Sequence, residues 1–195
     1  AVLQYSSGKH GFVTQADLIV NFDSKPDAEG HILNLTADLD VEWGDWLVAD
    51  FQQAVTGVEP QWFDEESFLA CASVEGRTVL YRLYLDGRVE KIFDELLHLT
   101  GATILSEDEL FITYSTTTVP SVLARLNLKT GEITDLYNPN EAYLAEHIVT
   151  TPERFTYKGY DNWDIHGWYM PPVEKSDKHA AILYVHGGPQ VAYGE

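Results

Sequence analysis

The stretch VLYRLYLDGRVEKIF, residues 79–93, returns in altered form as VLARLNLKTGEITDLY at residues 122–137. Four positions match at a constant spacing of 43 residues, pairing Leu80 with Leu123, Arg82 with Arg125, Leu83 with Leu126 and Leu85 with Leu128. Phe68 and Phe111 keep this spacing upstream, and it becomes 44 after the turn, between Val89 and Ile133. A period near 43 residues is typical of one four-stranded β-propeller blade.

Within each copy, short strands with alternating apolar residues are separated by turn signals. Glu75-Gly76 and Asp86-Gly87 punctuate the first copy, and Thr130-Gly131 punctuates the second. We therefore predict repeat units at about 62–104 and 105–138, and the C-terminal part of a β-propeller over 1–150. Upstream, DLIVNF, HILNLT and GDWLVADF are interpreted as strands of an earlier blade whose limits the pattern does not fix.

The pattern changes after Asn138, so we place a domain boundary near 138–152. A short helical pattern follows, with Asn140 as its expected N-cap. RFTYKGY and DIHGWYM are then expected to pair as a hairpin across Asp161-Asn162. AAILYVH, a continuous apolar run, predicts a strand buried on both faces. Residues 151–195 therefore begin a different sheet, and the predicted fold class is mainly β, with a partial β-propeller followed by the first strands of a second domain.

Charge and composition exclude several classes of partner. The 195 residues carry a net charge of -19, which argues against nucleic acid and anionic membrane surfaces. The single cysteine, Cys71, allows no intrachain disulfide and is interpreted as a small buried hydrophobe. No histidine spacing suits a metal and no glycine loop suits a nucleotide, so we expect neither metal nor cofactor. A cytoplasmic location is expected, although Ala1 suggests that the natural chain begins upstream.

The sequence HGGP, residues 186–189, follows the predicted buried strand. Two glycines leave the backbone N–H groups uncovered, so Gly187 and Gly188 could direct an N–H at a developing oxyanion. A tight turn that needs glycine for geometry alone explains the same residues equally well.

Together, these C-terminal segments resemble the prolyl oligopeptidase family of serine peptidases, and its acylaminoacyl-peptidase and dipeptidyl-peptidase branches in particular. The resemblance covers roughly residues 57–195. The residues that carry it are Pro152-Glu153, the turn from Tyr157 to Asp161, Ile165-His166-Gly167-Trp168, Pro171 and His186 to Pro189. The family usually has Asp-Gly where this chain has Asp161-Asn162.

The resemblance implies a β-propeller that screens peptide substrates by size above an α/β-hydrolase domain. It implies that residues 151–195 are the start of this hydrolase domain. It also implies that the N–H of Gly188, placed by Gly187, is one oxyanion donor, and that His186 and Pro189 support the loop. No serine in this chain lies in a G-x-S-x-G elbow, so the serine, aspartate and histidine of the triad are expected beyond Glu195. We accordingly expect a fragment that is inactive alone, from a parent peptidase that could form homo-oligomers.

Two other functions stay open at this point. A non-catalytic propeller scaffold would explain the repeat equally well, but it has no use for residues 152–189. A lipase or esterase would explain the HGG loop, but an ordinary esterase carries no blade repeats before it.

Overall fold

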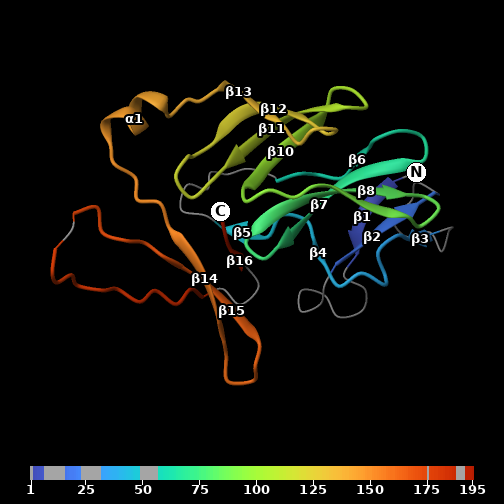
Figure 1. Cartoon of the computed structure of the whole chain (residues 1–195). Coiled ribbons are helices and arrows are strands. Elements are labelled where there is room, and N and C mark those ends of the chain that lie inside the picture. The colour runs from blue at the N-terminus through green and yellow to red at the C-terminus, as the bar shows by residue number, and fades with distance from the viewer. Residues whose placement is uncertain (1, 7–15, 23–31, 49–56, 175, 188–191) are drawn as a thin grey trace.

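The computed structural model describes residues 2–6, 16–22, 32–48, 57–174, 176–187 and 192–195. Regular structure in these residues is almost entirely β-strand, and α1 (Glu141–Glu146) is the one helix among them (Figure 1). The main sheets are antiparallel and are built from segments close together in the sequence. The predicted mainly β class, with propeller-like sheets, is confirmed.

The second repeat unit forms a four-stranded antiparallel sheet in simple sequential order. Its strands are β10 (His98–Ile104), β11 (Glu109–Ser115), β12 (Val122–Asn127) and β13 (Ile133–Tyr137). The sequence repeat assigned residues 98–104 to the end of the first unit, whereas β10 pairs with β11, with Ile104 opposite Leu110. This sheet therefore has the strand number and order of one blade.

The first repeat unit forms a sheet around its longest strands, β7 (Ser67–Val74), β8 (Arg77–Tyr84) and β9 (Val89–Phe93). Two short strands, β4 (Glu42–Trp43) and β6 (Gln61–Trp62), both pair with β7. They lie opposite its two ends, β4 at Ala72 and Ser73 and β6 at Phe68 and Leu69. The edge position of this sheet is therefore divided between two pieces of chain.

The two copies of the repeat occupy the same places in their sheets. β8 and β12 are the third strands, and β9 and β13 are the last. Both strand pairs shift register at the same repeat position, between Leu80 and Tyr81 in one and between Leu123 and Ala124 in the other. A bulge of this kind bends and twists a strand. Its recurrence shows that the repeat preserves local backbone shape as well as hydrophobic pattern.

A third sheet lies nearer the N-terminus and contains β1 (Val2–Ser6), β2 (Asp17–Asn21) and β3 (Ile32–Asn34). Two of the upstream strand predictions, DLIVNF and HILNLT, are confirmed by β2 and β3. The third, GDWLVADF, forms only the short β5 (Leu47–Val48) before the described residues stop at 48. β5 pairs in parallel with β16 (Ala192–Tyr193), far along the chain.

The sheet of the first repeat unit, which contains β7, β8 and β9 and is called the central sheet below, packs against neighbouring sheets on both faces. On one face of β7, Leu69 and Cys71 join a buried cluster with leucines of β10, β11 and β12. On the other face, Phe68 and Ala70 join a cluster with Leu18 of β2. Face-to-face stacking of small sheets is how propeller blades bury their apolar residues. It also explains why FLACA, residues 68–72 of β7, is continuously apolar, since a strand covered on both faces has no polar side.

Cys71 is fully buried in this stack, as expected from the sequence. Its Sγ donates to the Val58 carbonyl oxygen at 3.3 Å, and burial raises the pKa of the thiol. Because the thiolate is the reactive form, we predict no reaction of the native chain with a thiol reagent such as Ellman's reagent. The urea-unfolded chain should react completely over the same time. Stoichiometric labelling without denaturant would contradict this burial.

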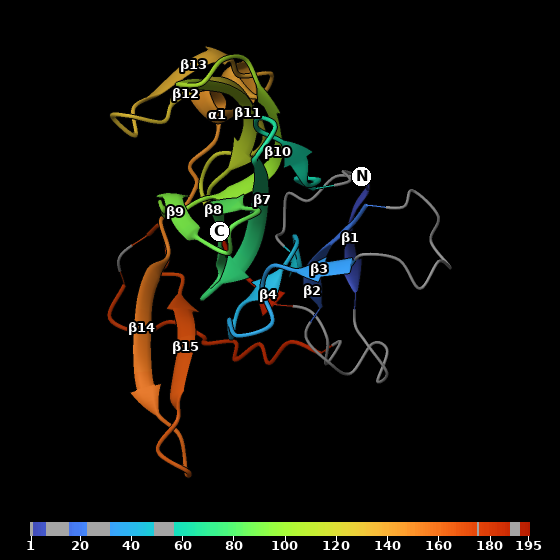
Figure 2. The same ribbon diagram turned by 90° about the vertical axis from the view of Figure 1, so that its right-hand side faces the viewer.

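The chain leaves the stacked sheets after β13. α1 begins where the helix was predicted, but the Asn140 side chain makes no capping hydrogen bond. Instead, Oδ1 of Asn138 accepts the Asn140 N–H at 2.9 Å. β14 (Glu153–Lys158) and β15 (Asp164–Tyr169) then form the predicted antiparallel hairpin. Figures 1 and 2 show this hairpin extending away from the sheets.

The strand predicted at Ala180–His186 is not formed. This segment has no regular structure, and Ile182 and Leu183 are 93% and 89% exposed. A buried strand needs partners for its backbone groups and cover on both faces. No described strand pairs with this segment, and most of its apolar side chains stay uncovered.

Candidate functional site

The predicted oxyanion loop begins where the exposed segment ends. His186 and Gly187 are described, whereas Gly188 and Pro189 lie outside the described residues. A Cβ atom added at Gly187 would meet nothing within 4 Å, and its φ is not left-handed. Neither steric contact nor backbone conformation therefore requires glycine at 187. The oxyanion role of Gly187 and Gly188 stays a prediction.

His186 lies in a small aromatic cluster. Its ring stacks on that of Tyr193, with centroids 4.6 Å apart and planes 26° apart. Its Nδ1 donates to the carbonyl oxygen of Gly187 at 3.2 Å, and the hydroxyls of Tyr184 and Tyr193 lie 3.2 Å apart. Stacking fixes the imidazole plane, and no carboxylate is found bonded to this ring among the described residues. The supporting role of His186 and Pro189 in the loop stays a prediction. Sequence reasoning missed both tyrosines because no spacing rule links them to the HGG loop.

The hairpin before the loop is closed by local backbone contacts. The N–H of Gly159 donates to the Trp163 carbonyl oxygen at 2.8 Å. The N–H of Asn162 donates to the Gly159 carbonyl oxygen at 3.0 Å. Asn162 takes a φ of 67°, which asparagine tolerates better than most residues. This explains how Asp161-Asn162 replaces the Asp-Gly expected at the turn. In the strands, the Phe155 ring covers Gly167 opposite, where a Cβ would lie 2.6 Å from Cζ.

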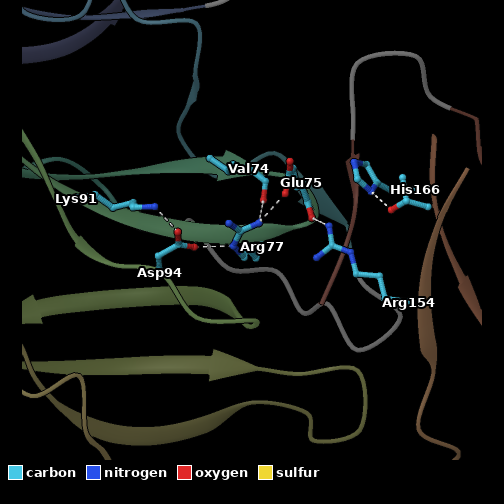
Figure 3. Close-up of polar contacts among 8 residues, drawn as sticks. Val74, Glu75, Arg77, Lys91, Asp94, Arg154 and His166 are labelled. Atoms are coloured by element: carbon cyan, nitrogen blue, oxygen red, sulfur yellow. Dashed lines mark hydrogen bonds and ion pairs between the residues drawn. The ribbon is translucent and has the colours of Figure 1, made fainter. Parts of the chain in front are cut away.

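A polar network lies where the hairpin passes the central sheet (Figure 3). Arg77 donates from Nε to Asp94 at 2.6 Å, and from Nη1 to the Val74 carbonyl and the Glu75 carboxylate at 3.3 Å. Lys91 donates to the second Asp94 oxygen at 2.5 Å. Arg77 and Lys91 together hold the pKa of Asp94 below its usual range, with the Arg77 hydrogen bond as the main cause.

This network supports the turn between β7 and β8. Because the folded-state pKa of Asp94 is depressed, its pairing stabilises the fold above the unfolded pKa of the carboxyl. That stabilisation is lost as the pH falls through the folded pKa. The network involves charged groups but places no nucleophile beside a base, so its role is structural.

A hydrogen-bonded pair, His98 with Asp45, is almost completely enclosed. Nε2 of His98 lies 2.8 and 2.9 Å from the two carboxylate oxygens of Asp45. The side chains are 1% and 8% exposed. The pair joins β10 of one sheet to the segment before β5, and no described nucleophile contacts it. We therefore interpret it as a link between sheets.

Two further properties bear on the class of site. Among the described residues, no group of three or more histidine, cysteine, aspartate or glutamate side chains is placed to hold a metal ion. In the same residues, α1 is far too short to cross a membrane.

Comparison with protein-family models gives no match. A curated protein of Bacillus subtilis (strain 168), the "Uncharacterized peptidase YuxL", is 29% identical over 170 residues. The match covers 85% of this chain and 26% of the relative. The chain therefore spans about a quarter of the length of the curated relative.

Solved structures show the same fold. An acylaminoacyl peptidase of Pyrococcus horikoshii superposes with a TM-score of 0.56 at 19% identity, covering 83% of this chain and 22% of its own. The AtxE2 isopeptidase, in a variant with astexin3-dC4 bound, also gives 0.56, at 17% identity, covering 90% of this chain and 24% of its own. The resemblance to the prolyl oligopeptidase family predicted from the sequence is confirmed by these relatives.

Proposed function

We propose that this chain is part of a serine peptidase that hydrolyses short peptides, of the acylaminoacyl-peptidase or oligopeptidase type. The observation that carries the proposal is the similarity to a peptidase over 85% of the chain. The order of structure along the chain supports it, since stacked propeller-like sheets are followed by a separate hairpin and then by HGGP.

In this proposal the parts have different tasks. The N–H of Gly188 stabilises the oxyanion, and His186 and Pro189 hold the loop. The serine, aspartate and histidine come from sequence beyond Glu195, so the 195 residues alone are inactive. The stacked sheets restrict entry to short peptides.

The first experiment measures the intact mass of the native protein from its source, with peptide sequencing past Glu195. A mass well above 22.0 kDa and a G-x-S-x-G peptide that a fluorophosphonate labels are the expected results. Turnover of acylated and free peptide p-nitroanilides, compared with p-nitrophenyl esters, then separates a peptidase from an esterase. A native chain that ends at Glu195 and takes no label would leave a non-catalytic scaffold.

Replacing Gly188 with proline in the longer protein tests the oxyanion donor directly, because proline has no N–H. We predict a fall in kcat of about 100- to 1000-fold with KM changed little. Gly188→Ala is the matched control, since it changes the same position but keeps the backbone N–H. Equal kcat in Gly188→Pro and wild type, at equal melting temperature, would remove Gly188 from the oxyanion hole.

A further inference from the structure

The turn between β7 and β8 has an unusual set of neighbours. Glu75 and Gly76 form its two central positions with φ of 47° and 80°, between Val74 and Arg77, which pair across the strands. Two left-handed residues make the tight turn that matches strand twist. The Arg77 network fixes one side of this turn, and the other side faces segments from the end of the chain.

The first of these segments is the β14–β15 hairpin. Nη2 of Arg154 donates to the carbonyl oxygen of Glu75, which is 79 residues away in sequence (Figure 3). The same guanidinium lies 5.6 Å from the ring centroid of Trp168, its partner across the hairpin. The Trp168 ring in turn packs on Gly76, where an added Cβ would lie 3.0 Å from Cη2. The hairpin therefore contacts both residues of the turn.

The second segment is the end of the chain after the HGG loop. The N–H of Glu195 donates to the carbonyl oxygen of Gly76 at 2.9 Å. Gly194 lies so close to Gly76 that a Cβ atom added at Gly194 would overlap the Gly76 carbonyl. A Cβ atom added at Gly76 would in turn lie 3.2 Å from the carbonyl oxygen of Tyr193. β16 pairs with β5, which follows β4 in the sequence. The Ala192 N–H also donates to the Trp46 carbonyl oxygen at 3.1 Å.

We infer that the Glu75-Gly76 turn is a docking point that ties the propeller-like sheets to both segments flanking the HGGP loop. Arg154 and Trp168 hold the hairpin before the loop, and Gly76 receives the strand after it. Gly76 is required twice, for its left-handed φ and for the close approach of Trp168 and Tyr193. These docking contacts do not depend on the proposed peptidase function. That function decides only whether the docking also positions a catalytic loop.

The test is hydrogen exchange of the 195-residue chain with alanine at Gly76, followed peptide by peptide. Gly87→Ala is the matched control, because Gly87 has a φ of 90° but an added Cβ meets nothing within 4 Å. Both variants carry the same kind of backbone strain, and only Gly76→Ala displaces the docked segments. We expect exchange in residues 153–169 and 192–195 to rise at least about tenfold in Gly76→Ala and to stay unchanged in Gly87→Ala.

A second series serves if Gly76→Ala does not fold. Arg154→Met removes the donor but keeps an alkyl stem, and we expect faster exchange in residues 153–169. Arg154→Lys restores a donor and should recover part of the protection. Arg125→Met, an exposed arginine on β12, is the control that should change nothing in the hairpin. Equal exchange in Arg154→Met and Arg125→Met would overturn the inference without affecting the proposed peptidase function.

Discussion

Phe68→Ala is expected to lower the free energy of unfolding by about 3–5 kcal/mol, among the largest effects of any single substitution in this chain. Phe68 is fully buried on β7, in the cluster that joins the central sheet to β2. Its ring also contacts that of Trp62, with centroids 3.8 Å apart. Removing it leaves a cavity between two sheets that cannot close without moving one of them. Urea unfolding followed by circular dichroism measures the change.

The repeat itself supplies the control. Phe111 occupies the position of Phe68 in the second unit, but it is 41% exposed. Phe111→Ala should therefore cost clearly less than Phe68→Ala, since less apolar area leaves the solvent on folding and the loss of a partly exposed ring opens no enclosed cavity. Equal losses in the two variants would mean that the sheets do not stack as described here.

The strands of both repeat units could be predicted from the sequence because their information is local. Turn residues and alternating apolar positions depend on the nearest few residues, and the 43-residue spacing located equivalent strands. The sheet that a strand joins, by contrast, is not determined by its nearest residues alone. The repeat assigned β10 to the end of the first unit, yet β10 pairs with β11 of the second. The first sheet completes its edge with two short pieces, β4 and β6, and β4 lies well before the repeat.

The wrong prediction at Ala180–Val185 has the same origin. A continuous apolar run predicts burial, but burial requires a partner surface, which a periodicity argument assumes. In the described residues that surface is missing, and the run stays exposed. The apolar pattern of this segment therefore indicates that the segment can be buried against a partner surface. It does not predict the structure of the segment where such a surface is missing.

The candidate site was predicted only in part. The HGG motif located the loop, and the resemblance gave its residues a role. The contacts that hold its surroundings, from Arg154 to Glu75 and from Glu195 to Gly76, join residues far apart in sequence. An arginine in a strand or a glycine in a turn gives no sign of such a partner. Only the folded chain brings them together.

Asp45→Ala is the second substitution with a large expected effect. Asp45 accepts from Nε2 of His98 through both carboxylate oxygens, and its Oδ1 also accepts the Leu47 N–H at 3.2 Å. Removing one partner of an enclosed pair leaves the other polar group without compensation. We therefore expect a loss of about 1–3 kcal/mol in the free energy of unfolding.

Asp86→Ala is the matched control for the Asp45 variant. Asp86 also accepts a hydrogen bond from a basic side chain, Arg88, but both side chains are largely exposed. Its loss should change the free energy of unfolding far less than the loss of Asp45 does, because water replaces the partner. His98→Ala combined with Asp45→Ala should cost less than the sum of the two single losses, since the second substitution removes a group already unpaired. Additive losses would mean that the two side chains do not stabilise each other. The fully buried link between β10 and the segment before β5 would then be a contact without energetic consequence.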